Sequence, residues 1–285
     1  MRRLLKAITP PVLASAGRRV ERFVRARHTP PEWEPRPQGW LPDAPVAGWN
    51  VETAVTAYRA KLPAFRDAIT GPGPLGVSTS AVMELKEPSV GQQNTLLAFA
   101  YALSLASRTS DHVSVLDWGG GLGFFSLLSR AVLPEEVAIE FHCKEVPLIC
   151  AAGSETFPDV TYWDDDRCLD RRYDLVMASS SLQYCEDWHD AARRLARASG
   201  RYLLLTRVPV VLDRPSFVVL QRPRSRQLQT EALCWIVNRD ELVDAATAEG
   251  SVELVREFLQ GGKPQFPGAA PQDETRAYLF RATSR

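Results

Sequence analysis

A glycine-rich segment after one apolar run constrains the fold of this chain more than any other feature. The β-branched stretch Val113–Leu116 ends in Asp117, and an apolar segment long enough for a helix, Phe124–Leu133, begins seven residues later. Between them lie the spaced glycines Gly119, Gly121 and Gly123. This order predicts a strand, a tight loop and the start of a helix, in which the main chain can approach a nucleotide-like ligand closely.

The spacing of these glycines separates two classes of ligand. The dinucleotide fingerprint G-x-G-x-x-G needs its third glycine where this chain has Phe124, so the pattern G-x-G-x-G favours S-adenosylmethionine (SAM) over NAD. The glycines let the main chain pass beside the methionine and ribose portions of SAM, and Asp117 can orient the loop and reach the ammonium group. N–H groups at the start of the following helix can face the methionine carboxylate. A turn that only packs a helix on a strand is the alternative.

Composition sets broad limits on the class of protein. The chain has 285 residues, 45% of them hydrophobic, which suits one α/β domain with extensions and a sizeable core. Its formal net charge is zero, so no global basic surface indicates a nucleic-acid partner. The five cysteines are scattered without a C-x-x-C pair, which is typical of reduced thiols in a cytoplasmic protein. No spacing of Cys, His, Asp or Glu predicts a metal site.

Residues 1–28 are expected to form a basic, apolar arm, with eight lysines and arginines against one acid. Pro10 and Pro11 interrupt its apolar stretch, and the eleven residues between Lys6 and Arg18 are too few to cross a bilayer, which argues against a signal peptide. Basic side chains interleaved with apolar ones predict peripheral contact of residues 1–27 with the inner face of a membrane. A solvated basic arm is the equal alternative.

The stretch 29–90 is expected to be a Pro- and Trp-rich linker with a helical extension. Asn50 can cap a helix that runs to about Leu62, and the glycines and prolines that begin at Gly71 then break the chain. This extension precedes the alternating segments and is expected to pack its aromatic side chains on the main domain.

Residues 91–285 are expected to form that main domain, in which strands alternate with helices and so predict a parallel sheet. The segment 209–237 is expected to be a long connection on the substrate side, and Asn238 to cap the helix after it. The expected strands are 113–117, 137–144, 159–163, 174–179, 201–208, 252–259 and 276–283, and the expected helices are 92–107, 122–133, 146–156, 188–198 and 238–249. Seven strands with helices on both faces make a Rossmann-like α/β sheet.

A second ligand residue is Glu145, which ends one expected strand and lies 22 residues after Gly123. This is close to the spacing of the acid that accepts hydrogen bonds from ribose hydroxyls, and two carboxylate oxygens suit a vicinal diol. A solvated acid at a strand end is the alternative. Asp165, in a run of three aspartates after the next strand, is the candidate for the adenine amino group, and a helix cap or a solvated loop is the alternative for the other two aspartates.

The end of the strand 174–179 is expected to face the methyl group that is transferred, with Ser179 at its last position contacting the cofactor. The sequence there lacks the Asn/Asp-Pro-Pro-Tyr pattern of amine- and amide-methylating enzymes, which favours an oxygen acceptor or another acceptor that is not an amide. A hydroxyl acceptor benefits from a base, and the candidates are Asp187 and His189. His189 begins an expected helix, so a solvent-exposed side chain is the alternative.

Three residues are candidates for the substrate side of the site. Tyr184 follows the same strand end. Arg222 belongs to the basic run 221–226, which can bind a phosphorylated or carboxylated substrate, although a charge run is more often solvated. Trp235 can close the same pocket or belong to the core.

With these residues in view, the chain resembles the class I SAM-dependent methyltransferases, and more narrowly a bacterial family of methyltransferases associated with surface-polysaccharide loci. The family usually has Phe where this chain has Trp118, and often Ser at Gly120 or Gly121. The segments that carry the resemblance occur in order between about 90 and 260 and are Leu116–Gly123, Lys144–Pro147, Ser180–Asp187, Val219–Arg222 and Cys234-Trp235. The resemblance implies SAM binding and methyl transfer in the biosynthesis of a glycan or similar small molecule. It also implies a short basic-apolar segment at the N-terminus.

The leading hypothesis is therefore a cytoplasmic SAM-dependent methyltransferase, O-directed, with a glycan precursor or another small metabolite as acceptor. A second hypothesis is a SAM-fold scaffold without turnover that recruits a biosynthetic complex to the membrane. Transfer of another SAM-derived group is a third. An NAD dehydrogenase is disfavoured by Phe124.

Overall fold

The computed structural model describes residues 32–41, 46–81, 88–223, 228–261 and 274–283. Contacts divide the chain into two compact units, 1–32 and 33–285, and the second contains nearly all of the described residues. The expected basic arm and its membrane contact lie outside the described residues, as do Arg224 and Arg226 of the basic run. No helix in the described part of the chain is long and apolar enough to cross a membrane.

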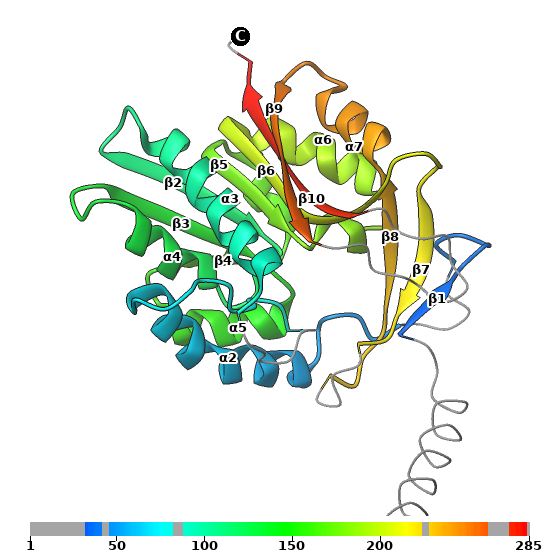
Figure 1. Cartoon of the computed structure of the whole chain (residues 1–285), viewed down its shortest axis with the longest axis horizontal. Coiled ribbons are helices and arrows are strands. Elements are labelled where there is room, and N and C mark those ends of the chain that lie inside the picture. Colours follow the sequence, from blue (N-terminus) through cyan, green and yellow to red (C-terminus); the bar gives the residue numbers. More distant parts are fainter. Residues whose placement is uncertain (1–31, 42–45, 82–87, 224–227, 262–273, 284–285) are drawn as a thin grey trace, which may run out of the picture. The chain divides into compact units, whose positions relative to one another are not determined.

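One mixed sheet forms the centre of the unit 33–285 (Figure 1). Its parallel part has the order β4-β3-β2-β5-β6, and the chain leaves β2 toward β3 and β4 before it returns to β5 on the other side. The sheet is extended by β10, antiparallel to β6, and by β9, antiparallel to β10. The strands are β2 (His112–Trp118), β3 (Ala138–Lys144), β4 (Thr161–Trp163), β5 (Tyr173–Ser179), β6 (Ser199–Val211), β9 (Val252–Gly261) and β10 (Glu274–Ala282). These seven strands confirm the Rossmann-like fold, with the reversal of strand order at β2.

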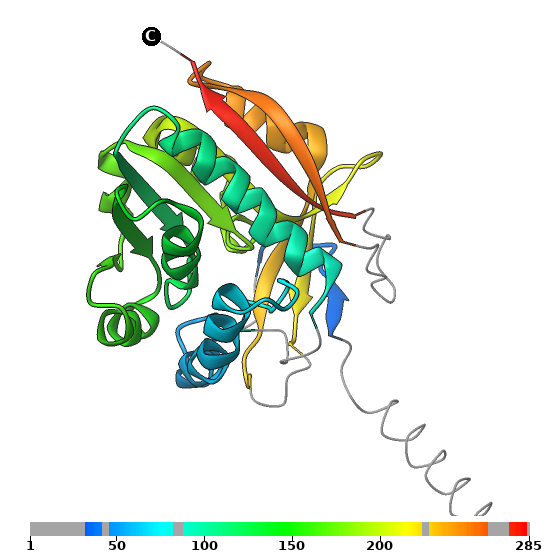
Figure 2. The same ribbon diagram turned by 60° about the vertical axis from the view of Figure 1, so that its left-hand side comes forward.

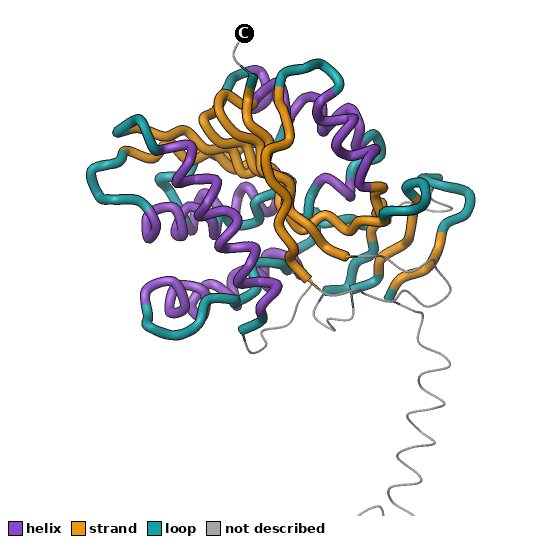
Figure 3. The backbone as a smooth tube through the Cα atoms, turned by 45° about the horizontal axis from the view of Figure 1, so that its top comes forward, coloured by secondary structure: helices purple, strands orange, loops and turns teal. Residues whose placement is uncertain are grey.

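Helices cover both faces of this sheet (Figure 2), and Figure 3 shows the strands between the helical layers. Along β2, Val113 and Val115 point into a core with α3, α4 and α5, because neighbouring side chains of a strand face opposite ways. Leu116 and Trp118 point into a second core with α6 and α7. Burial on both faces explains the unbroken apolar run of β2. The helices are α2 (Glu52–Thr70), α3 (Val90–Ser107), α4 (Phe124–Val132), α5 (Pro147–Thr156), α6 (Trp188–Ala198) and α7 (Arg239–Thr247).

The sequence analysis predicts a long connection over 209–237. The structure instead has two strands in this segment. β7 (Phe217–Gln221) and β8 (Ala232–Asn238) pair with each other, and β1 (Trp33–Pro35) adds to β7. Prolines indicated a loop, but Pro215 and Pro223 flank β7 without interrupting it. β8 joins the main sheet where β6 extends past the end of β5, so this small antiparallel sheet stands at the carboxyl edge of the parallel strands (Figure 1).

The helix α2 is longer than its sequence predicts. It continues through Pro63 to Thr70 because its apolar side, including the fully buried Phe65, packs on α4 and α5. Asn50 does not cap it; the Asn50 side-chain oxygen instead accepts a hydrogen bond from the N–H of Leu148, at 3.1 Å, in the first turn of α5. The predicted cap of α7 is present, since Asn238 accepts from two N–H groups of the first turn.

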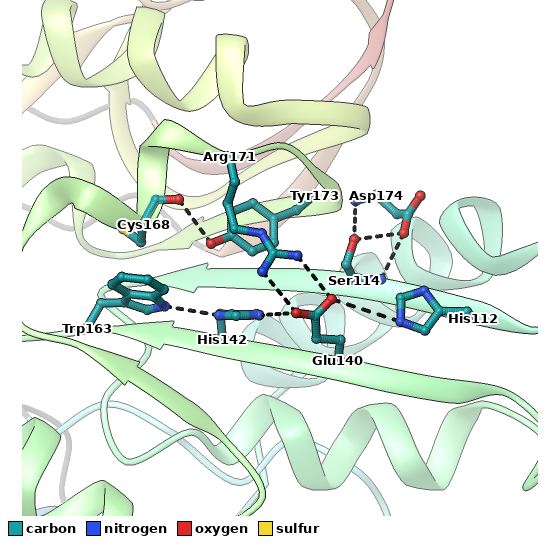
Figure 4. A network of polar contacts seen from close by, with 9 residues as sticks. All are labelled: His112, Ser114, Glu140, His142, Trp163, Cys168, Arg171, Tyr173 and Asp174. Atoms are coloured by element: carbon teal, nitrogen blue, oxygen red, sulfur yellow. Dashed lines mark hydrogen bonds and ion pairs between the residues drawn. The ribbon is translucent and has the colours of Figure 1, made fainter.

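A polar network ties β3 to β4 and to the segment before β5 (Figure 4). Glu140 accepts two hydrogen bonds of 3.0 Å from the guanidinium of Arg171 and lies 2.9 Å from Nε2 of His142. The indole N–H of Trp163 donates to Nδ1 of His142 at 3.0 Å. Since Nδ1 accepts, Nε2 carries the proton and donates to Glu140. Burial is the main cause that lowers the pKa of His142, so this ring is neutral at physiological pH.

Candidate functional site

A cavity with about 950 Å³ of empty space, which includes the part open to solvent, lies at the carboxyl ends of β2, β3 and β5 and beside β6. Its walls include the loop after β2 (Trp118–Gly121), the end of β3 (Lys144–Val146) and the turn after β5 (Ser179–Ser181). Arg207 of β6 and Tyr58 of α2 also line it. Ligands of open α/β sheets bind outside the strand ends where the strand order reverses, which is the position of this cavity beside β2.

The three spaced glycines have left-handed backbone torsions, with φ of +77° at Gly119, +63° at Gly121 and +88° at Gly123. A Cβ at Gly119 would lie 2.2 Å from Cβ of Ser181, and one at Gly121 would lie 2.9 Å from the ring of Tyr58. These glycines are therefore required by the close approach of neighbouring protein segments as well as by the turn. Both line the cavity, as expected for a ligand-binding loop.

Gly123 has a different place, which the glycine pattern alone does not reveal. It does not line the cavity but precedes α4 as its N-cap residue, and a Cβ there would lie 2.8 Å from the hydroxyl of Tyr162. That hydroxyl donates to the carbonyl of Leu122 at 2.8 Å. In this structure, Gly123 therefore serves the packing of β4 against the start of α4.

Asp117 lies beneath the glycine loop. Its side chain is fully buried, and neither carboxyl oxygen has a hydrogen-bond partner among the described residues. A Cβ on Gly120 would touch this carboxyl group at 2.5 Å, so the loop stands between Asp117 and the cavity. Burial raises the pKa of Asp117 to about 8, with added repulsion from Glu145 and an opposing effect of Arg207. The group is mainly protonated at neutral pH, and a nearby positive charge would ionise it.

Glu145 connects the ends of two neighbouring strands. Its Oε1 accepts from the N–H of Gly121 and its Oε2 from the N–H of Val146, both at 2.9 Å. Burial raises the pKa of Glu145, and these two backbone donors oppose the effect. Each carboxylate oxygen has a second lone-pair site, so both can still accept a hydroxyl of a bound diol. Glu145 also lines the cavity, where the sequence analysis predicts the ribose.

Arg207 is a cavity residue that the sequence analysis missed. Its Nε donates to the hydroxyl of Ser179 at 2.9 Å and its Nη2 to the carbonyl of Ser179 at 3.1 Å. Arg207 and Ser180, both with φ of +56°, are the two non-glycine residues with left-handed torsions in the described part of the chain. Such torsions cost on the order of 1–3 kcal/mol each and concentrate at functional sites. Both residues line the cavity.

A β-bulge in β6 explains why the sequence does not predict that Arg207 faces the cavity. Arg276 of β10 pairs with Val208, and Tyr278 pairs with Leu205, so Ala277 faces two residues of β6. The extra residue shifts the alternation by one, and Leu205 and Val208 consequently point into the same core. Regular alternation would put Arg207 on that apolar side. No local sequence signal marks this shift, because it is a relation between strands about 70 residues apart.

The N-terminal extension supplies another wall that the sequence analysis did not assign to the site. Trp49, Tyr58 and Ser80 all line the cavity. The predicted substrate residue Tyr184 also lines it; its hydroxyl donates to Oε1 of Gln221 at 2.7 Å, and its ring meets Trp49 edge to face at 5.1 Å. Burial is the main cause that raises the pKa of both Tyr58 and Tyr184, so both phenols are neutral donors at physiological pH.

The structure does not bring the other predicted cofactor and catalytic residues to the cavity wall. Asp165 accepts from the N–H of Arg167 and pairs with its side chain at 2.7 Å, as the cap of a short 3-10 helix. Asp187 caps α6 by accepting from the N–H of Asp190. His189 is exposed in the first turn of that helix, with its ring stacked on Trp188 at 3.7 Å. His189 thus follows the solvent-exposed alternative stated for it, whereas Asp165 and Asp187 act as helix caps in place of the roles predicted for them.

Two predicted substrate residues belong to the small antiparallel sheet instead of the cavity wall. Arg222 forms ion pairs with Glu34 at 2.7 Å and Glu231 at 3.1 Å. Trp235 stacks on Trp40 with ring centroids 5.9 Å apart. These contacts hold β1, β7 and β8 together with the extension.

A scan against protein-family models finds no match to this chain, and a search of curated proteins finds none. Solved structures with a similar fold include the SAM-bound amino pentose methyltransferase CalS10 from Micromonospora echinaspora, at 14% identity over 67% of this chain and 91% of that one, with a TM-score of 0.45. A SAM-dependent methyltransferase from Methanosarcina mazei is 12% identical over 64% of this chain and 97% of that one, with a TM-score of 0.46. The cyclase SpnF is 14% identical over 86% of this chain and 99% of that one, also with a TM-score of 0.46. At these identities and TM-scores, ligand and reaction must be argued from the cavity itself.

Proposed function

We propose that this chain is a SAM-dependent methyltransferase that acts on a small-molecule acceptor. One observation carries the proposal: the glycine loop after β2 and Glu145 after β3 form one continuous cavity wall, joined by the hydrogen bond from Gly121 to Glu145. This wall stands where the strand order reverses, the position at which α/β sheets bind nucleotide-like ligands. A glycine turn that served only packing would not need a buried carboxylate beside it in a cavity.

The residues of this wall fit SAM chemically. Glu145 would accept hydrogen bonds from the ribose hydroxyls, and the main chain at Gly119 and Gly121 would contact the cofactor without side-chain collision. Asp117, whose two oxygens have no partner among the described residues, would balance a positive charge on the other side of the loop. Bound SAM supplies an electrophilic methyl group on a positively charged sulfur.

The chain's own contribution to the reaction is mainly positioning. The turn Ser179–Ser181 and the phenols of Tyr58 and Tyr184 face the same cavity and would orient an acceptor against the cofactor wall. No histidine is found among the described residues of the wall, so we assign no histidine base. The missing Asn/Asp-Pro-Pro-Tyr pattern after β5 supports an oxygen acceptor, and the sequence resemblance supports a glycan precursor or a related metabolite.

Calorimetry with S-adenosylhomocysteine (SAH) tests the cofactor wall. Glu145→Ala is expected to lose about tenfold or more in affinity, because a buried hydrogen-bonded diol loses on the order of 1–3 kcal/mol. Glu145→Gln keeps one side-chain oxygen that can accept from the N–H of Gly121 and so preserves the loop. A loss of affinity in this variant is therefore due to the missing contact with the ligand and not to collapse of the loop. Glu155→Ala, which removes a mostly exposed acid of α5, is the matched control. Equal affinity for SAH in wild type and Glu145→Ala would show that Glu145 does not contact the ligand.

Turnover is tested with methyl-labelled SAM and metabolite extracts, followed by mass spectrometry of labelled products. A labelled O-methyl product supports the proposed reaction. SAH binding without any labelled product across broad extracts would instead favour the scaffold hypothesis.

A further inference from the structure

We infer that the cavity contains a second subsite, centred on Arg207, which binds an anionic oxygen group of the acceptor, a carboxylate or a phosphate. The inference rests on the proposed function, which assigns the wall of the glycine loop and Glu145 to the cofactor. It names a specificity-determining residue and the chemical class of the acceptor.

The guanidinium of Arg207 has donors to spare. Two of its five N–H groups are used by Ser179, and it forms no ion pair with a carboxylate of the described residues. Every Arg207 side-chain nitrogen that lacks a hydrogen-bond partner is accessible to solvent. Because Arg207 lines the cavity, the unused N–H groups open into it. A planar fork of free donors matches the two oxygens of a carboxylate or phosphate.

Two other cations that could bind an anion here have carboxylate partners. Lys144, which also lines it, lies 3.6 Å from Asp166 and rests on the ring of Trp118 at 4.9 Å. Arg222, the anion-binding candidate of the sequence analysis, is held by two carboxylates outside the cavity wall. Within the described wall, Lys144 has a carboxylate partner and Arg207 has none, so Arg207 is the cation of that wall whose charge is left for an incoming anion.

The backbone around Arg207 is built to hold this side chain in place. The N–H of Arg207, turned out of the strand ladder by the bulge, donates to Oε1 of the buried Gln260 at 2.7 Å. The amide nitrogen of Gln260 donates to the hydroxyls of Thr206 at 2.6 Å and Thr95 at 3.2 Å. Bulges commonly re-aim a side chain beside a functional site, and a left-handed arginine kept by a buried amide network is such a case.

The position of Arg207 points to the acceptor as the source of the anion. The same chemistry is present in the methionine carboxylate of the cofactor, which the sequence analysis places at the start of α4 after the glycine loop. Arg207 lies on β6, two strands and about 10 Å from the loop strand β2. Its hydrogen bonds go to the turn after β5, and the phenols of Tyr58 and Tyr184, which the proposal gives to the acceptor, lie near it, as does Asp117 beneath the glycine loop.

The test measures anion binding to the full chain with and without saturating SAH. Inorganic phosphate and acetate are titrated separately, and binding is followed by calorimetry and by intrinsic tryptophan fluorescence, to which Trp49 and Trp118 of the cavity wall contribute. Arg207→Gln is expected to weaken the binding of the preferred anion by about tenfold or more, in the presence of SAH as well as in its absence. Arg222→Gln, which removes a paired arginine, is expected to change it less than about twofold.

Arg207→Gly provides a second variant, because glycine adopts a φ of +56° readily and so keeps the fold even where glutamine disturbs the bulge. It is expected to show the same loss of anion binding with unchanged affinity for SAH.

The outcomes separate the two proposals. Equal anion affinity in wild type and both Arg207 variants overturns the subsite, as does the failure of wild type to bind either anion. If SAH excludes the anion and both variants bind SAH about tenfold more weakly, Arg207 holds the cofactor carboxylate and the acceptor assignment is wrong. If wild type does not bind SAH, the proposed function fails, and the titration without SAH still decides whether Arg207 binds anions.

Discussion

The N–H of Gly121 donates to Oε1 of Glu145 at 2.9 Å, across 24 residues of sequence. This bond joins the loop after β2 to the end of β3, so these two segments form one continuous wall of the cavity. Tyr58 packs on the other side of Gly121 and brings the N-terminal extension into the same wall. The cavity is thus formed jointly by the sheet and the extension.

Gly121→Ala is expected to destabilise the protein more than Gly250→Ala. Both glycines have similar torsions, φ of +63° and +65°, but a Cβ at Gly121 meets the ring of Tyr58 at 2.9 Å whereas Gly250 has open space. Left-handed torsion alone costs about 1–2 kcal/mol, and overpacking adds about 1–3 kcal/mol. Urea unfolding measures the free energy of unfolding of both variants. An equal decrease in the two would show that the ring of Tyr58 moves aside without a loss of stability.

Asp117 is expected to make the free energy of unfolding fall as pH rises. Its pKa is raised from 3.8 to about 8 in the folded protein, so its contribution is fully present below pH 3.8 and is lost as pH rises toward 8. Relative to Asp117→Asn, wild type should lose up to about 1 kcal/mol per pH unit in this window. Denaturant unfolding at several pH values checks the slope, and parallel curves would contradict the raised pKa.

Binding of SAM is expected to release a proton near pH 7. Asp117 is mainly protonated in the free protein, and the positive charge of the ligand beside the loop favours its ionised form. Calorimetry in two buffers of different ionisation enthalpy measures the released protons, with Asp117→Asn as the control. Identical enthalpies for wild type in both buffers would rule this linkage out.

His142 is expected to make the protein less stable in mild acid. Its pKa is lowered by burial, so its contribution is fully present above the ordinary value of 6.5 and is lost as pH falls toward the lowered value. Between about pH 7.5 and pH 5.5, wild type should lose more stability than His142→Phe. Glu140 also has a lowered pKa, mainly through its hydrogen bond with Arg171, but its window lies below its ordinary 4.5. Indistinguishable pH profiles for the two proteins would contradict a neutral His142.

Gln260→Met is expected to cost about 1–3 kcal/mol, because it leaves the N–H of Arg207 without its acceptor in the bulge. Thr247→Val is the control, because it also removes one side-chain hydrogen bond, the local bond from Thr247 to the carbonyl of Val243 in α7. Urea unfolding gives the cost. Anion binding should weaken as well, since Arg207 loses its fixed position; unchanged anion binding would show that the bulge persists without Gln260.

Local chemistry was sufficient to predict the first half of the candidate site. The apolar run of β2, the glycines after it and the spacing to Glu145 all lie within one strand–helix–strand unit. Strand, loop and helix signals act within a few residues there, so the wall formed by Gly119, Gly121 and Glu145 could be located without any tertiary contact.

The other half was decided by contacts between distant segments. Asp165, Asp187 and Arg222 have the charge that a binding site needs, but each found a nearer partner in a cap or an ion pair. The strand β7 was hidden by Pro215 and Pro223, which prove to flank it. A charged residue has no preferred role until its neighbours are known, because the same group serves a cap, an ion pair or a ligand.

By itself, then, the sequence determined a Rossmann-like sheet and the position of one wall of the cavity, since these follow from backbone preference and short-range spacing. Only the tertiary structure decided that Tyr58 closes the cavity and that Arg207 faces into it. The physical reason is register: one extra residue in β6 opposite Ala277 reverses the side to which Arg207 points, and register is a property of paired strands.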